Sequence, residues 1–241
     1  MVENNYEISF IKNFICTKDD RLDIIRENIP HFAEIINPYP VFVNYDTDIN
    51  FEEIKEIYEN HIENLHFQKK LNQDWAEVTN EMLDMTTSPF ISYLSEDIFF
   101  HPDFNKEDFQ NLFEEYKLNN SKHMLMGKVD KYTYEHNHAN SKKGEYLWHF
   151  HSSNSPTMFN NGGQGVLSLV GLYDRDLFKT CLHKTIGKGK GLKGMEMYER
   201  LNTLKNIDIN CSTPNQSFFT EVHPNKGTTE RGTNQIQGFT S

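Results

Sequence analysis

The chain has 241 residues, of which 37% are hydrophobic and 13% aromatic, and it carries a formal net charge of -11. This composition is that of a folded globular protein rather than a disordered one, and the length suffices for one large α/β domain or two small ones. The acidic balance argues against a nucleic-acid partner, which needs basic patches to contact phosphates.

Targeting and redox signals point to the cytoplasm. No apolar run approaches the roughly 20 residues of a membrane helix, and the first residues are too polar for a signal peptide. The three cysteines, Cys16, Cys181 and Cys211, are far apart and form no CxxC pair. This pattern favours buried thiols in a reducing compartment over a disulfide framework. We expect a cytoplasmic protein without an integral membrane segment.

Apolar, β-branched runs alternate with helical periodicity over the first hundred residues. Strands are expected at 8–16, 40–46 and 89–94, with a short one within 63–71, and helices at 22–32, 51–61 and 72–88. Pro30 should limit the first of these helices. The alternation predicts a mainly parallel sheet with helices on both faces, which binds its ligands at the carboxyl ends of the strands.

The second half of the chain has a different character. It begins with a helix at 109–117, after which strands are expected at 122–138, 144–153 and 165–174. Helices are expected at 175–185 and 194–204, separated by the Gly/Lys-rich segment 186–194. The polar tail after Cys211 is expected to be irregular.

The most informative segment is the end of the 89–94 strand, where Ser95, Glu96 and Asp97 follow in sequence. Carboxylates at the end of a buried strand need a compensating cation. A hard divalent ion together with a nucleotide diphosphate would suit their oxygen ligands. The alternative is a solvated turn.

This order of features resembles the GT-A glycosyltransferases, especially the large inverting family 2, over roughly residues 10–205. In that family the first strand ends in a Thr/Asn-Arg segment, the second in an acid that contacts the nucleoside, and the fourth in an Asp-x-Asp motif. The resemblance implies nucleotide-sugar contacts for Thr17, Asp20, Arg21, Asp46, Asp48, Trp75, Ser95 and Glu96. It also implies that Mn²⁺ or Mg²⁺ is held by Asp97, Glu96 and the late His223. The chain departs from the motif at Ser95, which stands where the family has Asp.

The later half is also similar to this family. Residues 162–178 resemble its acceptor-side strand, which ends in a basic-acidic pair opening a helix. Residues 191–201 resemble its following helix, whose first acid is the catalytic base, and Glu196 matches that acid. Met197 replaces the second acid of the pattern. The alternative is that Glu196 is a solvent-exposed helix residue that forms an i, i+4 ion pair with Arg200.

The resemblance implies one GT-A-type α/β domain over residues 1–241, with a nucleotide-sugar-binding half at 1–110 and an acceptor-binding half at 111–241. Its sheet should be parallel or mixed and flanked by helices, with a smaller sheet on the acceptor side. The implied function is metal-assisted, inverting transfer of a sugar from a nucleotide-diphosphate sugar to a hydroxyl of a glycan or other acceptor. In such a reaction the carboxylate base removes the acceptor proton. The alternative, motivated by Ser95 and Met197, is a non-catalytic module that binds nucleotide sugars or glycans.

Other motifs leave further alternatives open. The pairs His136/His138 and His149/His151 are either a Zn²⁺ site, as in a zinc hydrolase, or ordinary polar strand faces. The lysines of the 186–194 segment, Lys188, Lys190 and Lys193, either meet a diphosphate as a lid or lie in a solvated loop. Trp75 and Trp148 either stack on a ligand or belong to the core. A nucleotidyltransferase would need a Gly-rich loop after the first strand, and residues 17–21 contain no glycine.

Overall fold

The computed structural model describes residues 6–15, 21–125, 142–152, 167–204, 207–216, 218–223 and 227–231, with the backbone alone for Glu221, His223 and 227–231. The helices are α1 (Arg21–Ile36), α2 (Phe51–His61), α3 (Trp75–Asp84), α4 (Lys106–Leu118), α6 (Arg175–Thr185) and α7 (Gly191–Leu201). The strands of the first half are β1 (Ile8–Phe14), β2 (Val41–Tyr45), β3 (Leu65–Lys69), β4 (Phe90–Ser95) and β5 (Ile98–Phe100). The later strands are β6 (His123–Leu125), β7 (Lys142–Lys143), β8 (Leu147–His151), β9 (Gly171–Asp174), β10 (Asn210–Pro214), β11 (Phe219–His223) and β12 (Gly227–Arg231).

A mixed sheet of nine strands forms the middle layer of the molecule. Its order is β3-β2-β1-β4-β9-β6-β10-β8-β7, and a small sheet of order β12-β11-β5 lies beside it. The strands β3, β2, β1 and β4 are parallel, whereas β9 runs antiparallel to both of its neighbours. The predicted fold class, a mixed sheet flanked by helices with a second small sheet, is confirmed.

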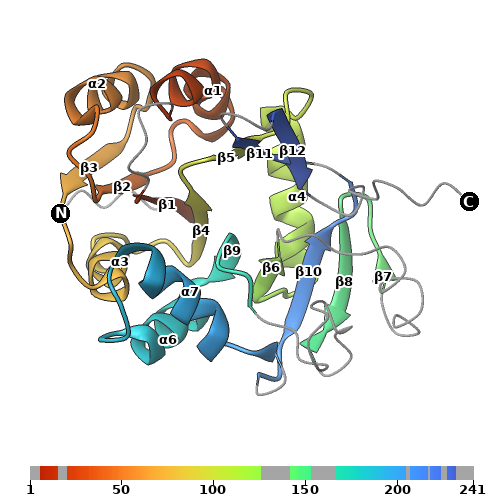
Figure 1. Cartoon of the computed structure of the whole chain (residues 1–241). Coiled ribbons are helices and arrows are strands. Elements are labelled where there is room, and N and C mark those ends of the chain that lie inside the picture. The colour runs from red at the N-terminus through yellow and green to blue at the C-terminus, as the bar shows by residue number, and fades with distance from the viewer. Residues whose placement is uncertain are drawn as a thin grey trace, which may run out of the picture.

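The helices cover both faces of the parallel strands because these strands are apolar on both sides. Alternate residues of β1 diverge: Phe10 and Phe14 belong to a core cluster shared with α1, α2 and α4, whereas Ile11 belongs to a second cluster shared with α3, α6 and α7. In Figure 1, α1 and α2 lie on one side of the sheet and α3, α6 and α7 on the other. A strand covered on both faces is typical of parallel α/β sheets.

Two sequence-based expectations about element ends are wrong. The helix α1 continues through Pro30 to Ile36, because the residues after the proline, including Phe32 and Ile36, are fully buried in the core and offset the lost hydrogen bond. The described residues of the tail after Cys211 are not all irregular, since they include most of β10 together with β11 and β12. The pairing of these strands is only partly local: β10 pairs with β6 and β8, and β11 pairs with β5 as well as with the adjacent β12.

The cysteines that the structure describes fit the expectation of buried thiols. Cys181 and Cys211 are both free and fully buried. Burial raises the pKa of the Cys181 thiol to about 11, so this group is protonated and unreactive at neutral pH. Cys16 lies outside the described residues.

The packing of α7 against α3 yields a stability prediction at Gly194. A Cβ atom at this position would lie 2.6 Å from both the Gly189 carbonyl oxygen and Cβ of Trp75. Helix propensity alone predicts that Gly194→Ala is stabilising by about 1 kcal/mol. Because of the close contacts, we expect it instead to lower the free energy of unfolding by about 1–3 kcal/mol in urea denaturation.

A matched control for this experiment lies in the same helix. Leu192 is 61% exposed, so Leu192→Ala should change the free energy of unfolding by less than about 0.5 kcal/mol. An alanine at position 194 that raised the stability would show that α7 does not pack against α3 as described.

Candidate functional site

The ends of three adjacent parallel strands define the candidate site. Phe14 of β1 pairs with Tyr45 of β2, and Asn13 of β1 pairs with Ser95 of β4. The residues that follow these strands therefore emerge at one edge of the sheet. This is the edge at which doubly wound α/β sheets bind ligands.

Asp97 lies in the turn between β4 and β5, and several groups fix its position. Ser95 Oγ donates a hydrogen bond to Asp97 Oδ1 over 2.8 Å, and Arg21 Nη2 lies 3.5 Å from Asp97 Oδ2. The backbone N–H of Val222 in β11 donates to the Asp97 carbonyl oxygen over 2.9 Å. The Asp97 side chain is 15% exposed, so it is held in place but still open to solvent.

Arg21, the first residue of α1, connects the turn to the small sheet. Its Nη1 donates to the Val222 carbonyl oxygen over 3.3 Å, while its Nη2 faces Asp97. The structure thus brings Arg21, Ser95 and Asp97 together at the end of β4. The preceding residues Thr17 and Asp20, also expected to contact the nucleotide, lie outside the described part of the chain.

Glu96 is the buried member of the acidic pair. Burial, with a smaller contribution from the Asp97 charge, raises the pKa of Glu96 to about 7. Arg21 and Lys12 oppose this shift. Glu96 is therefore partly protonated at neutral pH, and it contributes less negative charge than its sequence position suggests.

Lys12 is the residue that sequence reasoning missed. It is fully buried in the middle of β1, where its Nζ donates to the Ile98 carbonyl oxygen over 3.2 Å. The ammonium lies 4.8 Å and 4.6 Å from the ring centres of Phe32 and Phe99. Burial lowers its pKa to about 8, although the charges of Asp97 and Glu96 oppose this. The signal in the sequence was a single charged residue inside a strand whose other residues are apolar or uncharged.

The carboxylates of Asp97 and Glu96 supply too few oxygen atoms to bind a divalent cation by themselves. A bound molecule would have to supply the remaining oxygen atoms. No group of three or more His, Cys, Asp and Glu side chains suited to a metal occurs within the described ranges. Magnesium is commonly bound by one or two carboxylates plus substrate phosphates, and Asp97 with Glu96 matches that mode. His223 lies on β11 directly after Val222, so its backbone runs beside the turn; its side chain is outside the description.

A pocket lies at the end of β2. Its volume is about 470 Å³, and it is lined by Asp46, Thr47, Asp48, Ile49, Leu71, Asn72, Lys190 and Gly191. Asp46 accepts a hydrogen bond from the backbone N–H of Asn72. Burial raises the pKa of Asp46, and the Asn72 bond and the Lys190 charge oppose this. Asp48 is largely exposed and forms an ion pair of 2.6 Å with Lys69.

Two other predicted site residues, Trp75 and Glu196, do not line the pocket at the end of β2. Trp75 is 3% exposed, packs edge-on against Tyr93 and Tyr198, and donates its indole N–H to the Tyr93 hydroxyl over 3.2 Å. It occupies the core, which was the alternative for this residue. Glu196 lies on the exposed face of α7. Its carboxylate is 3.7 Å from the guanidinium of Arg200, so the ion pair that was the alternative for this residue is present.

The described histidines do not supply a zinc site. Both ring nitrogens of His149 are engaged, Nδ1 with Ser212 over 2.9 Å and Nε2 with Glu115 over 2.8 Å. His151 Nε2 lies 3.1 Å from Asp208. His136 and His138 lie outside the described residues.

The architecture identifies the class of fold, which is that of the GT-A glycosyltransferases. Three solved structures of residues 1–349 of S. aureus TarS share it: the complex with UDP, the complex with UDP-GlcNAc and a third structure of the same fragment. Their TM-scores are 0.58, 0.57 and 0.53, each at 16% sequence identity. Each covers 89% of this chain, whereas this chain spans only 58–60% of the TarS fragment.

Sequence comparison adds nothing to this structural likeness. No family model matches the chain, and no curated protein matches it. Within the part of the chain that the structure describes, no helix has the length and apolarity to cross a membrane.

The buried carboxyl of Glu96 yields a pH prediction for the metal-free protein. Its pKa is raised from 4.5 in the unfolded chain to about 7 in the folded chain. The stability that it contributes is therefore complete below pH 4.5 and is lost as the pH rises through 7, by up to about 3 kcal/mol. We expect Glu96→Gln, which mimics the neutral acid, to flatten the dependence of the melting temperature on pH between 5 and 8.

The control for this variant is Glu56→Gln on the exposed face of α2, which should keep the parental pH profile. A Glu96→Gln profile that also matched the parent would mean that the folded protein does not raise the pKa of this carboxyl.

Proposed function

We propose that this protein is a glycosyltransferase that moves a sugar from a nucleotide-diphosphate sugar to a hydroxyl of a glycan or another acceptor. The observation that carries the proposal is the position of Asp97. The Asp97 carboxylate is partly exposed to solvent and is held by Ser95 and Arg21 at the end of β4. It lies at the same edge of the sheet as the pocket beside Asp46. The GT-A fold is consistent with this chemistry without requiring it.

In the proposed enzyme, Asp97 binds a divalent ion, Mn²⁺ or Mg²⁺, with Glu96 and His223 as further ligands. Such an ion would neutralise charge on the leaving diphosphate. The nucleoside would occupy the pocket at Asp46 and Asp48, next to the turn.

Arg21 supplies a second cation in this scheme. Its guanidinium is charged at all relevant pH values and is suited to phosphate oxygens. Arg21 already pairs with Asp97. A bound metal would therefore compete with Arg21 for the Asp97 carboxylate, and a diphosphate would compete with Asp97 for the Arg21 guanidinium. The turn is thus charge-balanced before the donor arrives.

Glu196 is the proposed base that takes the proton of the acceptor hydroxyl, in an inverting reaction. Its ion pair with Arg200 is exposed on both sides and is worth at most about 1 kcal/mol, so it does not prevent such a role. The same exposure favours the competing proposal, a module that binds a nucleotide sugar without turnover.

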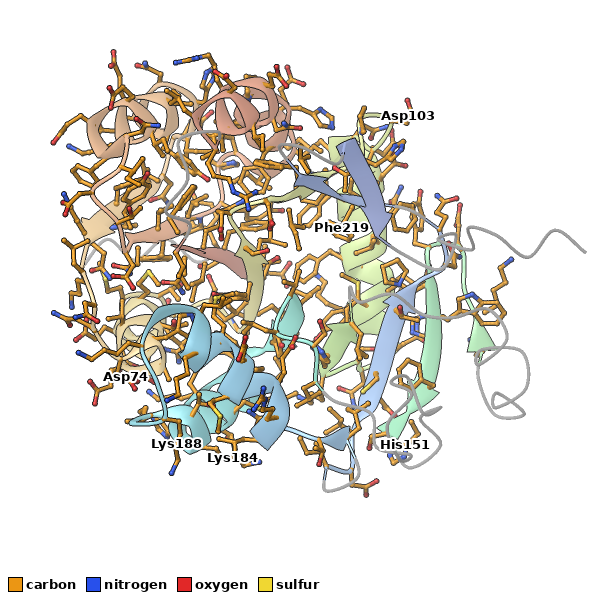
Figure 2. All side chains as sticks on the ribbon, viewed as in Figure 1. Asp74, Asp103, His151, Lys184, Lys188 and Phe219 are labelled. Carbon is orange, nitrogen blue, oxygen red and sulfur yellow. The ribbon has the colours of Figure 1, made fainter. Side chains whose placement is uncertain are left out.

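The binding role of Asp97 can be tested with UDP-GlcNAc and other nucleotide sugars by calorimetric titration in the presence of Mn²⁺. We expect Asp97→Asn to weaken binding at least about tenfold, because the variant loses the charge that holds the cation. Asp103→Asn is the matched control, since this side chain is 94% exposed on the loop after β5 (Figure 2). Equal affinities for parent and Asp97→Asn would refute the assignment.

Turnover separates the enzyme from the binding module. We expect the protein with Mn²⁺ to release nucleoside diphosphate slowly from its donor, and Glu196→Gln to slow this release about 100-fold without changing donor affinity. Arg200→Gln, which removes only the ion pair, should retain the parental rate. Binding without any release of diphosphate would favour the module.

A further inference from the structure

Lys12 is a lysine whose whole side chain is buried between the central sheet and α1. It lies two residues from both Phe10 and Phe14 of β1, so its side chain points to the same face of the sheet, the face that α1 covers. Its exposed fraction is 0%. A buried ammonium is costly unless neighbouring groups compensate its charge. The groups around Lys12 therefore indicate what it acts on.

Three groups hold the Lys12 ammonium in place. Nζ donates a hydrogen bond to the Ile98 carbonyl oxygen over 3.2 Å. The rings of Phe32 in α1 and Phe99 in β5 have their centres 4.8 Å and 4.6 Å from Nζ, and both side chains are buried. Aromatic faces attract a cation, most strongly where water is excluded. The ammonium is thus enclosed and cannot follow a ligand to the surface.

The enclosed ammonium lies directly behind the acidic turn, because Ile98 follows Asp97 in the chain. The charges of Asp97 and Glu96 favour its protonated form and oppose the effect of burial, and the pKa of Lys12 is about 8. The charged form therefore predominates at pH 7. Lys12 supplies a fixed positive charge to the inner side of the turn.

The two cations at the turn differ in their freedom to move. The Arg21 side chain is 14% exposed, so it can turn from Asp97 to a bound diphosphate, whereas Lys12 stays where it is. With both cations in place, and with Glu96 partly protonated, the turn carries little net negative charge. A free divalent ion is therefore attracted only weakly, since its attraction to Asp97 is offset by repulsion from Lys12.

We propose that Lys12 is an internal counter-ion that prevents the turn from binding a divalent ion by itself, so that metal binds only together with the diphosphate of the donor. This inference rests on the proposed use of a nucleotide-diphosphate donor. The diphosphate supplies the negative charge and the oxygen ligands that restore the attraction for the ion. Lys12 acts through the carboxylates and does not touch the metal, so it is a positioning residue.

Calorimetric titration with Mn²⁺ alone tests this inference. We expect the parent to bind Mn²⁺ with a dissociation constant above about 1 mM, because carboxylates without substrate phosphates hold such ions weakly. Lys12→Met keeps an unbranched side chain without the charge and should bind Mn²⁺ at least about tenfold more tightly. A turn that had merely lost its shape would bind Mn²⁺ less tightly, so the direction of the change separates charge from structure.

Lys12→Gln is a second variant, needed because Lys12→Met leaves the buried Ile98 carbonyl without its hydrogen-bond donor. The glutamine amide is neutral but still carries N–H donors. This variant should show the same gain in Mn²⁺ affinity. Adding Asp97→Asn to either variant should abolish the gain, which locates the ion at the turn.

Lys117→Met is the matched control. Its ammonium also lies over an aromatic ring, 4.9 Å from the centre of Phe113, and it pairs with Glu7 over 2.9 Å. Glu7 precedes β1, at the opposite end of the strand from the turn. The control removes the same charge from a similar environment, and it should keep the parental Mn²⁺ affinity.

The outcomes separate the two proposals. If neither UDP nor GDP binds the parent with Mn²⁺, the proposed function fails and this inference fails with it. If a nucleotide binds but the parent binds Mn²⁺ alone more tightly than about 1 mM, only the inference is overturned. This parental titration does not depend on the folding of a variant. A folded Lys12 variant that binds Mn²⁺ no more tightly than the parent also overturns the inference alone.

Discussion

The balance of charge at the end of β4 is the constraint on which the candidate site depends. Two adjacent acids, Glu96 and Asp97, are opposed by two cations that the chain itself supplies, the buried Lys12 and the half-buried Arg21. Buried charges are tolerated only when they are compensated, and here each sign is. The turn can therefore remain ordered without a ligand, yet its carboxylates remain available for one.

This balance also links distant parts of the chain. Arg21 opens α1, Lys12 lies in β1, and Val222 belongs to the small sheet, yet all three make contacts at the same turn. On the pocket side, Asp74, which caps α3, accepts a hydrogen bond from the backbone N–H of Gly187 in the segment between α6 and α7. The described residues of the site are thus held by hydrogen bonds between elements that are far apart in the sequence.

The sequence predicted the parallel half of the fold well because its signals are local. Apolar runs at β1, β2 and β4 and helical spacing at α2 and α3 are visible within a few residues. The sequence did not predict β10 and β11, whose partners β6, β8 and β5 are distant, nor β12, which pairs with β11. It also did not predict the continuation of α1 through Pro30, which depends on tertiary packing. Lys12 was similarly hidden, because its hydrogen-bond partner Ile98 lies 86 residues away in the sequence.

We propose that the turn supplies part of a metal site, which the diphosphate of the donor completes. The decisive measurement is the titration of UDP and GDP into the protein with and without Mn²⁺, because metal and nucleotide affinities are coupled reciprocally. Mn²⁺ should increase the affinity for the preferred nucleotide at least about tenfold, and this increase should disappear in Asp97→Asn. Equal nucleotide affinity with and without Mn²⁺ would rule out the proposed metal site.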